Sequence, residues 1–361
     1  MRQDAAAPRP MRPAGRALVT GASGFVGGWL LPALVAHGWS VWATANTRPP
    51  AAPTAAAPVD ETAADDAAAA VRWHVGDVRD PAHLAALLDA ARPDLIVHLA
   101  AVSHVPAAGR DPGLAAEVNV VAAARLLGLV RERRRAGALD PLVLVVGSGE
   151  QYGRHDEAAL PLVEDAPQRP HTVYAATKVA QEALALEAWR SDGVRVIATR
   201  SFNHSGPGQR PDFLLPGLAG RARALVARTR AGERGLALRM GNQTPVRDIL
   251  HVGDVVDAYI ALVAHGREGE AYNVASGVGV SVGMLARRVL ARVGLDCPVV
   301  SDPALVRAAD VPALVGSPAK LIAHTGWAPR RSLDDLLDAL LDDVPAEPAD
   351  VGERATVRSG G

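Results

Sequence analysis

Short runs of β-branched and apolar residues alternate with helical segments over the first 203 of this chain's 361 residues. The runs are rich in consecutive Val, Ile and Leu, which is typical of strands buried on both faces of a parallel sheet. The expected strands cover residues 17–21, 39–45, 72–78, 94–101, 141–148 and 194–203. Strands that alternate with helices predict a doubly wound parallel α/β sheet of the Rossmann type.

Beyond residue 203 the alternation becomes irregular, which predicts a second and smaller α/β lobe. We expect a Rossmann domain over 16–203 and a C-terminal lobe over 204–344, with helices near 213–231, 253–266, 281–293 and 333–343. Three further segments are poor in bulky apolar residues and cannot build a packed core. They are a disordered leader over 1–15, a low-complexity loop over 47–70 and a mobile tail over 345–361.

Charge and cysteine content narrow the functional class. The chain carries 38 basic and 39 acidic residues, so its charge does not favour nucleic acid or a membrane surface as a partner. No apolar run approaches the roughly 20 residues that span a bilayer. The single cysteine, Cys297, excludes an intrachain disulfide and is typical of a reducing cytoplasm. The 11 histidines show no metal-binding spacing such as HExxH, so we expect no metal site.

A glycine-rich turn follows the first expected strand and opens a helix. Its spacing is Gly21-x-x-Gly24-x-x-Gly27. Glycines at these positions permit a tight turn and a close approach of the backbone to a pyrophosphate. The N–H groups of the following helix N-terminus then face the negative charge. This context predicts a dinucleotide cofactor and favours it over an ordinary glycine-rich turn.

Two features bear on the adenosine half of that cofactor. Asp77, at the end of the third strand, can accept a hydrogen bond from the adenine amino group or cap the helix ahead of Pro81. At the end of the second strand, residues 44–48 (TANTR) lack the carboxylate that holds the ribose 2′-hydroxyl of NAD. The nearby Arg48 favours NADP, because an arginine commonly binds the 2′-phosphate of that cofactor.

The segment Tyr174-Ala-Ala-Thr-Lys178 is the sharpest chemical signal, since the chain has only four Tyr and two Lys. Residues four apart share a helix face, so both side chains can reach one site. A nearby ammonium is expected to lower the tyrosine pKa toward the working range of an acid–base catalyst. Ser148 ends an apolar strand, where its hydroxyl can hydrogen-bond a developing alkoxide. Glu150 follows as a contact for sugar hydroxyls or a second acid–base.

These motifs together resemble a known family. TGASGFVG, the HLAA of 98–101, Ser148 ahead of Tyr152-Gly153, and YAATK are similar to extended short-chain dehydrogenases/reductases acting on nucleotide sugars. The resemblance implies a catalytic triad of Ser148, Tyr174 and Lys178, with Asn119 supporting the active-site helix. The positions implied to contact NADP or NAD are Gly21, Ser23, Gly24, Phe25, Val26, Gly27, Arg48, Asp77, Val78, Leu99, Ala100, Ala101, Tyr174 and Lys178.

The second lobe resembles the GDP-4-dehydro-6-deoxy-D-mannose reductases. The similarity rests on residues 201–213, 241–259, 271–277 and 307–329 and extends over about 16–343. It implies a GDP-linked sugar substrate contacted by Ser103, Asn203, Arg247 and Arg307. Arginine suits this role because its fork meets phosphate oxygens in a bidentate manner. The two arginines can equally be surface charges, or ion-pair partners of Asp248 or Asp310.

Alternatives therefore remain for the activity. The resemblance favours NAD(P)H-dependent reduction of a GDP-4-keto-6-deoxyhexose. A 4,6-dehydratase or epimerase of the same fold is the first alternative, because elimination of water needs an acid–base beyond the triad and Glu150 offers one. A non-catalytic dinucleotide-binding protein is the second. The family further implies a homodimer that forms through the helix carrying YxxxK and its neighbour.

Overall fold

The computed structural model describes residues 15–46, 70–306 and 311–343. Apart from Gly15 and Ala70, the expected leader, low-complexity loop and tail lie outside these residues, as do Arg48 and Arg307. The chain divides into two compact units. The first comprises Met1–His204, Pro245–Val280 and Ala309–Ser332, and the second comprises Ser205–Thr244, Ser281–Ala308 and Leu333–Gly361.

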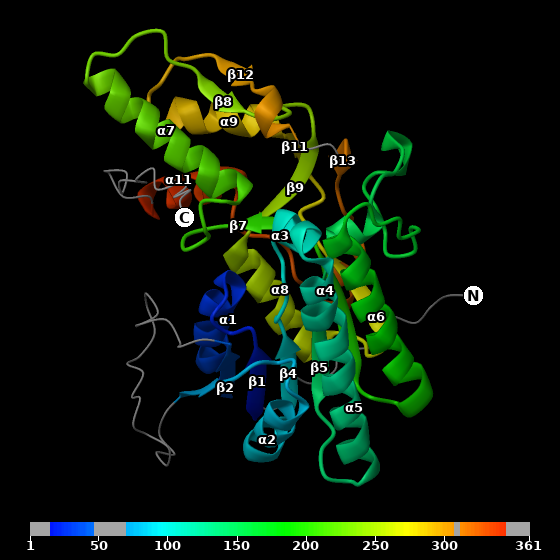
Figure 1. Ribbon diagram of the computed structural model, residues 1–361. Helices are drawn as coiled ribbons and strands as arrows, with labels where there is room; N and C mark the ends of the chain where they lie inside the picture. The colour runs from blue at the N-terminus through cyan, green and yellow to red at the C-terminus, as the bar shows by residue number, and fades with distance from the viewer. Residues whose placement is uncertain (1–14, 47–69, 307–310, 344–361) are drawn as a thin grey trace, which may run out of the picture. The chain divides into compact units, whose positions relative to one another are not determined.

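The first unit is built on a parallel seven-stranded sheet in the order β10-β6-β5-β4-β1-β2-β3 (Figure 1). Its strands are β1 (Arg16–Thr20), β2 (Ser40–Ala45), β3 (Val71–Val75), β4 (Leu95–His98), β5 (Leu142–Ser148), β6 (Val196–Ser201) and β10 (Glu270–Val274). All six expected strands are present, so the prediction of a doubly wound parallel sheet is confirmed. The strand order reverses between β1 and β4, because the chain adds β2 and β3 on one side of β1 and β4, β5 and β6 on the other. Ligands of such sheets bind at the carboxyl ends of the strands at this point.

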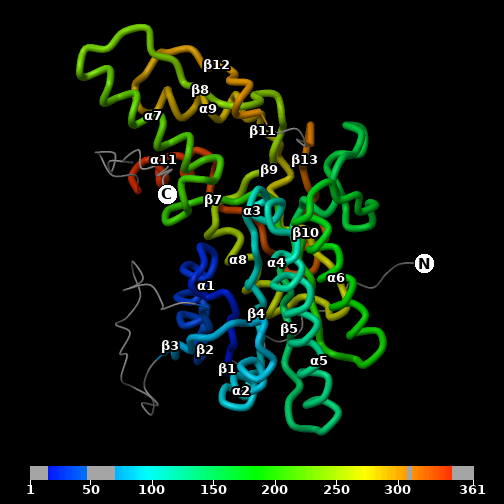
Figure 2. Tube along the Cα trace, viewed as in Figure 1, coloured from blue at the N-terminus to red at the C-terminus, as the bar shows by residue number. Residues whose placement is uncertain are grey.

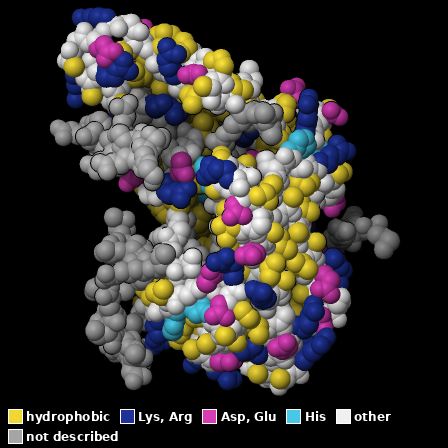
Figure 3. Space-filling view, viewed as in Figure 1, with side chains coloured by type: hydrophobic (Ala, Val, Ile, Leu, Met, Phe, Trp, Pro, Cys, Tyr) yellow, Lys and Arg dark blue, Asp and Glu magenta, His cyan; other side chains and the backbone are white. Residues whose placement is uncertain are grey.

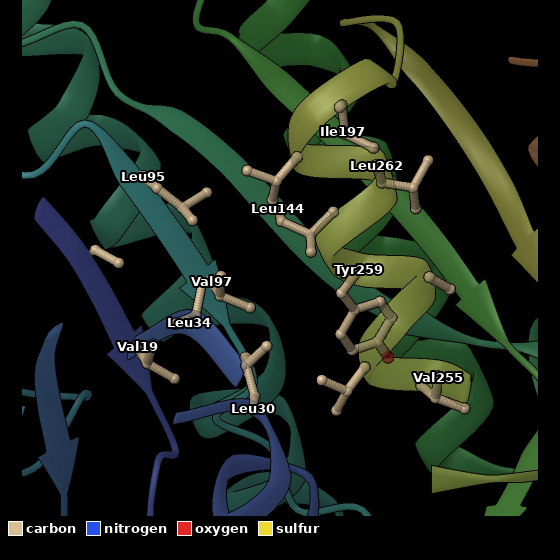
Figure 4. Close-up of a cluster of buried hydrophobic side chains, with 14 of the residues drawn as sticks. Val19, Leu30, Leu34, Leu95, Val97, Leu144, Ile197, Val255, Tyr259 and Leu262 are labelled. Atoms are coloured by element: carbon tan, nitrogen blue, oxygen red, sulfur yellow. The ribbon is translucent and has the colours of Figure 1, made fainter. Parts of the chain in front are cut away.

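Helices cover both faces of this sheet. On one face α1 (Phe25–Ala36), α8 (Val252–His265) and α10 (Ala319–Thr325) share a buried apolar cluster with the strands. Figure 4 shows part of this cluster, where Leu30 and Leu34 of α1 and Tyr259 of α8 lie against Val19 and Leu144 of the sheet. The opposite face is covered by α2 (Pro81–Ala91), α5 (Ala122–Arg135) and α6 (Val173–Asp192). Burial on both faces explains why the strands are apolar at consecutive positions.

Helix α6 has clear sequence signals at both ends. The Thr172 hydroxyl caps its start by accepting a hydrogen bond of 3.1 Å from the Ala175 N–H. Gly193 ends it in the left-handed conformation at φ 64°, which glycine adopts without a Cβ clash. These local signals define the helix that carries both Tyr174 and Lys178.

The helical segment over 112–135 contains an irregular turn. Helix α4 (Pro112–Ala116) continues through a π-helical turn (Glu117–Val121) into α5. By its length and by the mean hydropathy of an 18-residue window this segment is apolar enough to cross a bilayer, although Glu117 and Arg125 interrupt the apolar run. Its apolar face, with Leu126, Leu127 and Val130, packs into the core on one side of the sheet. We therefore interpret it as a core helix.

Shorter elements complete the first unit. They are α3 (Val105–Arg110), the 3₁₀ turns Gly149–Tyr152 and Glu157–Ala159, and a small sheet of β7 (Asn203–Ser205), β9 (Val246–His251), β11 (Gly279–Ser281) and β13 (Ala313–Leu314). Strands β7 and β11 lie where the chain passes into the second unit.

The second unit contains α7 (Leu214–Arg230), α9 (Val282–Arg292), α11 (Leu333–Asp343), the 3₁₀ turn Pro303–Leu305 and the parallel pair β8 (Leu238–Met240) and β12 (Val299–Ser301). Helix α8 and strand β10 come from the part of the chain expected in the second lobe, yet they belong to the first unit (Figure 2). The reason is packing: β10 pairs with β6, and α8 buries Val255, Tyr259 and Leu262 against the sheet.

Candidate active site

The glycine turn leaves the carboxyl end of β1 in the conformation that a dinucleotide requires. Gly21 has φ 68°, and a Cβ there would lie 2.6 Å from the Ala100 backbone nitrogen. Gly27 packs equally closely on Ala22, whereas Gly24 is exposed and a Cβ there would meet only the Gly21 carbonyl oxygen. The open side of the turn is therefore at Gly24.

Helix α1 starts directly after Gly24, and no described side chain caps it. Its first N–H groups are suited to phosphate oxygens for this reason. Ser23 is exposed beside the turn, while Phe25 and Val26 are half-buried. The Phe25 ring stacks on His204 with centroids 6.3 Å apart. The residues present thus fit a dinucleotide at this edge of the sheet.

A buried hydrogen bond and an electrostatic interaction relate the glycine turn to helix α6. The Thr20 hydroxyl, immediately before the turn, pairs with Nδ1 of His98 at 2.8 Å. Burial, and then the charge of Lys178, lower the pKa of His98 to about 3, so this imidazole is neutral at working pH. The charge of Lys178 therefore acts on a residue that contacts the end of β1.

Ser148 lies at the carboxyl end of β5 and is almost fully buried. The Glu150 N–H donates to its hydroxyl at 3.2 Å, and the Ser148 N–H donates to Oε1 of Gln151 at 2.7 Å. This is a capping box around the short 3₁₀ turn that follows. The Ser148 side chain lies close enough to the Tyr174 phenol to lower its pKa, so the structure brings these two candidate residues together.

The Tyr174 phenol departs from the sequence expectation. Burial raises its pKa to about 12, the hydrogen bond with Ser148 acts in the opposite direction, and the charge of Glu150 raises it further. The expectation of a lowered pKa is therefore wrong for this arrangement. The physical reason is that desolvation disfavours the phenolate, while the Lys178 ammonium is engaged elsewhere.

Lys178 is buried, with only 2% of its surface exposed. Its ammonium donates to the Val146 carbonyl oxygen and to Oε1 of Gln181, each at 2.8 Å. Burial lowers the pKa of Lys178 to about 7. Two of its three N–H groups are used in this way.

Glu150 lies in the same loop, half-buried, where its charge acts on Tyr174. Asn119 is placed in the π-helical turn. Its side chain accepts from the Val102 N–H at 2.7 Å and donates to the Thr177 hydroxyl at 2.8 Å. It thereby connects helix α6 to the loop after β4, in agreement with the supporting role expected for it. A π turn at this position is in keeping with the frequent occurrence of such turns at functional sites.

The predicted contacts of the adenosine half lie partly within the described residues. Asp77 does not cap helix α2, because Asp80 does so by accepting from the Ala82 N–H. The Asp77 carboxylate instead pairs with the guanidinium of Arg79 at 2.6 Å, and this contact holds the Asp77 pKa below its ordinary value. Val78 packs half-buried next to it. Arg48 lies outside the described residues.

After β4 the chain follows the glycine turn closely. The Leu99 N–H donates to the Thr20 carbonyl oxygen at 3.1 Å, and Ala100 contacts Gly21. Ala101 is half-buried, and Ser103 is exposed in the loop before α3. All of these residues lie at the carboxyl edge of the sheet.

The predicted substrate residues are less gathered. Asn203 is exposed on β7. Arg247 on β9 is 8% exposed, and its Nη1 donates to the carbonyl oxygens of Val246 and Val311 at 2.9 and 2.8 Å. Asp248, considered as an ion-pair partner of Arg247, accepts instead from Ser276. Arg307 lies outside the described residues.

Sequence reasoning missed a set of buried polar residues behind Ser148. Gln151 could have been found as the fourth position of an S-x-x-Q capping box. Glu182 stands one helical turn after Lys178, but the pairing of its carboxylate with Arg200 has no local signal. Within the part of the chain that the structure describes, no group of three His, Cys, Asp or Glu could hold a metal ion.

Comparison with known proteins adds independent information. The chain matches the model of the family described as GDP-mannose 4,6 dehydratase over residues 18–340. It is 34% identical over 328 residues to the GDP-6-deoxy-D-mannose reductase of Pseudomonas aeruginosa, an alignment that covers 91% of this chain and 96% of that relative.

Solved structures agree with this match. RMD from Pseudomonas aeruginosa, complexed with NADPH, is 31% identical with a TM-score of 0.73, covering 91% of this chain and 98% of that one. The Thermus thermophilus UDP-glucose 4-epimerase, in complex with NAD, is 28% identical with a TM-score of 0.74 and the same coverage. These matches confirm the resemblance to extended short-chain dehydrogenases/reductases. On this evidence the chain belongs to the GDP-mannose 4,6 dehydratase family.

Proposed function

We propose that this protein is an NAD(P)H-dependent reductase that converts the keto group of a GDP-4-keto-6-deoxyhexose to an alcohol. The observation that carries the proposal is the closeness of the Tyr174 phenol to the Ser148 hydroxyl at the carboxyl end of β5. Reduction of a ketone needs a proton donor at the developing alkoxide, and a phenol with a pKa of about 12 holds its proton at neutral pH. The similarity to a GDP-6-deoxy-D-mannose reductase also supports a reduction as the reaction of this protein.

The cofactor belongs at the glycine turn in this proposal. The backbone at Gly21, Ser23, Gly24 and the first turn of α1 would hold the pyrophosphate, and the remaining N–H of the Lys178 ammonium would contact the nicotinamide ribose. When bound, the reduced nicotinamide supplies the hydride that adds to the carbonyl carbon. Arg48 leads us to favour NADP over NAD, because of the 2′-phosphate.

The roles of the protein's own residues follow from their contacts. Ser148 hydrogen-bonds the carbonyl oxygen of the substrate and stabilises the charge that develops on it. Tyr174 transfers its phenolic proton to that oxygen, and the resulting phenolate is stabilised by Ser148. Because Ser148 is near enough to act on the Tyr174 phenol, both hydroxyls would reach one carbonyl oxygen.

The substrate residues complete the proposal. Arg247 and Arg307 would bind the diphosphate of the nucleotide, Asn203 its ribose or diphosphate, and Ser103 the sugar. The backbone contacts of Arg247 position its guanidinium, as expected of a residue that must meet a phosphate in one geometry. We also propose a cytoplasmic location, which fits a single cysteine.

A cofactor balance tests the reaction. The purified protein is mixed with NADPH and a GDP-4-keto-6-deoxyhexose, and the loss of nicotinamide absorbance is compared with the product measured by mass spectrometry. We expect one NADPH to be consumed for each alcohol formed. Turnover of GDP-mannose with no net consumption of cofactor would instead show a dehydratase.

That dehydratase is the second candidate, and Glu150 favours it. Its carboxylate lies close enough to Tyr174 to raise the phenol pKa, so it could act as the additional acid–base that elimination of water needs. The similarity over 91% of the chain to a GDP-6-deoxy-D-mannose reductase favours the reductase over this candidate. The same assay with GDP-mannose and NADP⁺ separates the two candidates.

We further propose a homodimer formed through α5 and α6. Figure 3 shows apolar side chains gathered over α4 to α6 on the face in view. Leu114 and Val121 on this segment are large apolar residues that are 37% and 38% exposed. Burial of such a face is favourable in a symmetric interface. Light scattering on a sizing column checks the mass, and Val121→Glu is expected to give the monomer.

A further inference from the structure

A buried polar cluster lies directly behind Ser148, and no step of the proposed reaction uses it. We define it as Gln151, Tyr152, Glu182, Arg200 and Asn273, all in the first unit. None is more than 6% exposed, and three are fully buried. Charged and amide groups at this depth are stable only when every hydrogen bond is made.

The charged members form a bidentate ion pair. Arg200 Nε and Nη2 donate to the two carboxylate oxygens of Glu182 at 2.9 and 2.7 Å. Nη1 of Arg200 donates to the Tyr152 hydroxyl at 2.8 Å and to the Glu164 carbonyl oxygen at 2.7 Å. The Tyr152 hydroxyl in turn donates to Oδ1 of Asn273 at 2.7 Å. Arg200 on strand β6 thus holds the Glu182 carboxylate in one orientation, and the Tyr152 hydroxyl helps to fix Arg200.

Gln151 connects the fixed Glu182 carboxylate to the backbone of Ser148. Its Nε2 donates to the Glu182 carboxylate at 2.8 Å, and its Oε1 accepts from the Ser148 backbone N–H at 2.7 Å. Gly147 makes room for the amide, because a Cβ at that position would collide with Oε1 of Gln151. The last residue of β5 is therefore bonded through one side chain to a carboxylate on α6.

Helix α6, which carries Glu182, also carries the proposed proton donor Tyr174. Glu182 follows Tyr174 by eight residues and Lys178 by four, so the three share one face of α6. Gln151 thus links the strand end that carries Ser148 to the helix face that carries Tyr174. The Lys178–Val146 hydrogen bond also ties α6 to β5, but at a point two residues before Ser148. Gln151 fixes the backbone of Ser148 itself.

We propose that Gln151, held by the Glu182–Arg200 pair, is a positioning residue that sets the distance between the Ser148 and Tyr174 hydroxyls. The proposal rests on the proposed reductase function. Apolar residues of similar volume would stabilise a core as well as a buried ion pair does, so what the charges add here is a defined geometry. Catalytic groups require such definition, because a displacement of about 1 Å can lower a rate about 100-fold.

Two matched amide variants test the proposal. Gln151→Met removes both bonds of the link and leaves the Glu182–Arg200 pair in place. Gln168→Met is the control, because Gln168 Nε2 also donates to Glu182, at 2.7 Å, but has no contact with Ser148. We expect kcat to fall about 10- to 100-fold in Gln151→Met and to stay within about threefold of wild type in Gln168→Met. The dissociation constant of NADPH should change in neither. Equal kcat values in the two variants would overturn the proposal.

A readout without turnover separates this inference from the proposed function. The ¹³Cζ NMR signal of Tyr174, assigned with Tyr174→Phe, reports the surroundings of the phenol, including the Ser148 hydroxyl, in the protein alone. We expect the signal to shift in Gln151→Met and not in Gln168→Met. An unmoved signal contradicts the positioning role even if the protein is a reductase. A shifted signal supports it even if wild type reduces no keto sugar.

Gln151→Glu provides a rescue by pH. One oxygen of the new carboxyl can still accept from Ser148, but the other faces the Glu182 carboxylate, and like charges raise the pKa of the pair. The protonated form restores the donor of glutamine. We expect the kcat of this variant, relative to wild type, to rise as pH falls. A ratio that stays constant with pH counts against the proposal.

Discussion

Lys178 on helix α6 donates a hydrogen bond of 2.8 Å to the carbonyl oxygen of Val146 on strand β5. Val146 precedes Ser148 by two residues on the same strand. The bond therefore holds the helix that carries Tyr174 against the strand that carries Ser148. In this structure the ammonium is hydrogen-bonded to the backbone of β5. Its charge also lowers the pKa of His98, which contacts Thr20 at the end of β1.

The charge state of Lys178 predicts how cofactor affinity varies with pH. Burial lowers its pKa to about 7, so the ammonium is lost as pH rises through that value. We expect the dissociation constant of NADPH to increase about fivefold across this range, since a charge-assisted bond worth ~1 kcal/mol more than a neutral one is lost. Fluorescence titration measures it. Lys178→Met should remove the pH dependence, whereas Lys320→Met should keep it.

The same shift has the opposite sign for stability. Between about pH 7 and the ordinary lysine pKa of 10.5, the unfolded chain binds a proton at Lys178 that the folded chain does not. This group's contribution to the free energy of unfolding therefore rises with pH in that window. Urea unfolding of wild type and Lys178→Met, compared across the window, isolates the contribution. A wild-type stability that fell relative to the variant would contradict the lowered pKa.

Replacement of Tyr174 by Phe tests the proton donor. We expect kcat to fall by about 10²- to 10⁴-fold, because general acid catalysis is removed while the ring still fills its space. The NADPH dissociation constant should stay within about twofold. Tyr272→Phe is the matched control: its hydroxyl, on the edge strand β10, accepts from the Arg267 N–H and pairs with His324. Wild-type turnover in Tyr174→Phe would remove this residue from the reaction.

Gly21→Ala is expected to impair both stability and cofactor binding. The left-handed conformation at Gly21 disfavours any other residue by about 1–2 kcal/mol, and the new Cβ would collide with Ala100. Gly28→Ala is the control, because a Cβ at this helical position meets nothing within 4 Å. It should raise stability by up to ~1 kcal/mol. Thermal unfolding and NADPH titration of the two variants distinguish a requirement of the turn from a general effect of alanine.

The Glu182–Arg200 pair should respond asymmetrically to substitution. Arg200→Met leaves a buried carboxylate without its partner and is expected to destabilise the protein by about 3–5 kcal/mol. The double variant Glu182→Leu/Arg200→Met should recover most of that loss. Arg228→Met, which breaks an exposed pair with Glu233, should leave the urea midpoint unchanged. A double variant no more stable than Arg200→Met would mean that the carboxylate is not the source of the destabilisation.

Much of the first unit could be predicted because its signals are local. The six strands follow from continuous Val, Ile and Leu, and the start and end of α6 from Thr172 and Gly193. Strand β10 was missed, because AYNV within residues 270–274 is short and its pairing with β6 depends on chain that is distant in sequence. The place of α8 in the first unit was missed for the same reason.

The amino-acid sequence alone determined the glycine turn at the end of the first strand and the helix that places Tyr174 and Lys178 on one face. Both depend on spacing of a few residues, which backbone geometry converts directly into position. Only the tertiary structure decided that the Tyr174 pKa is raised and not lowered, that Lys178 bonds Val146, and that Gln151 links Ser148 to Glu182. Those properties depend on desolvation and on partners from other elements, and neither is encoded in the spacing of residues along the chain.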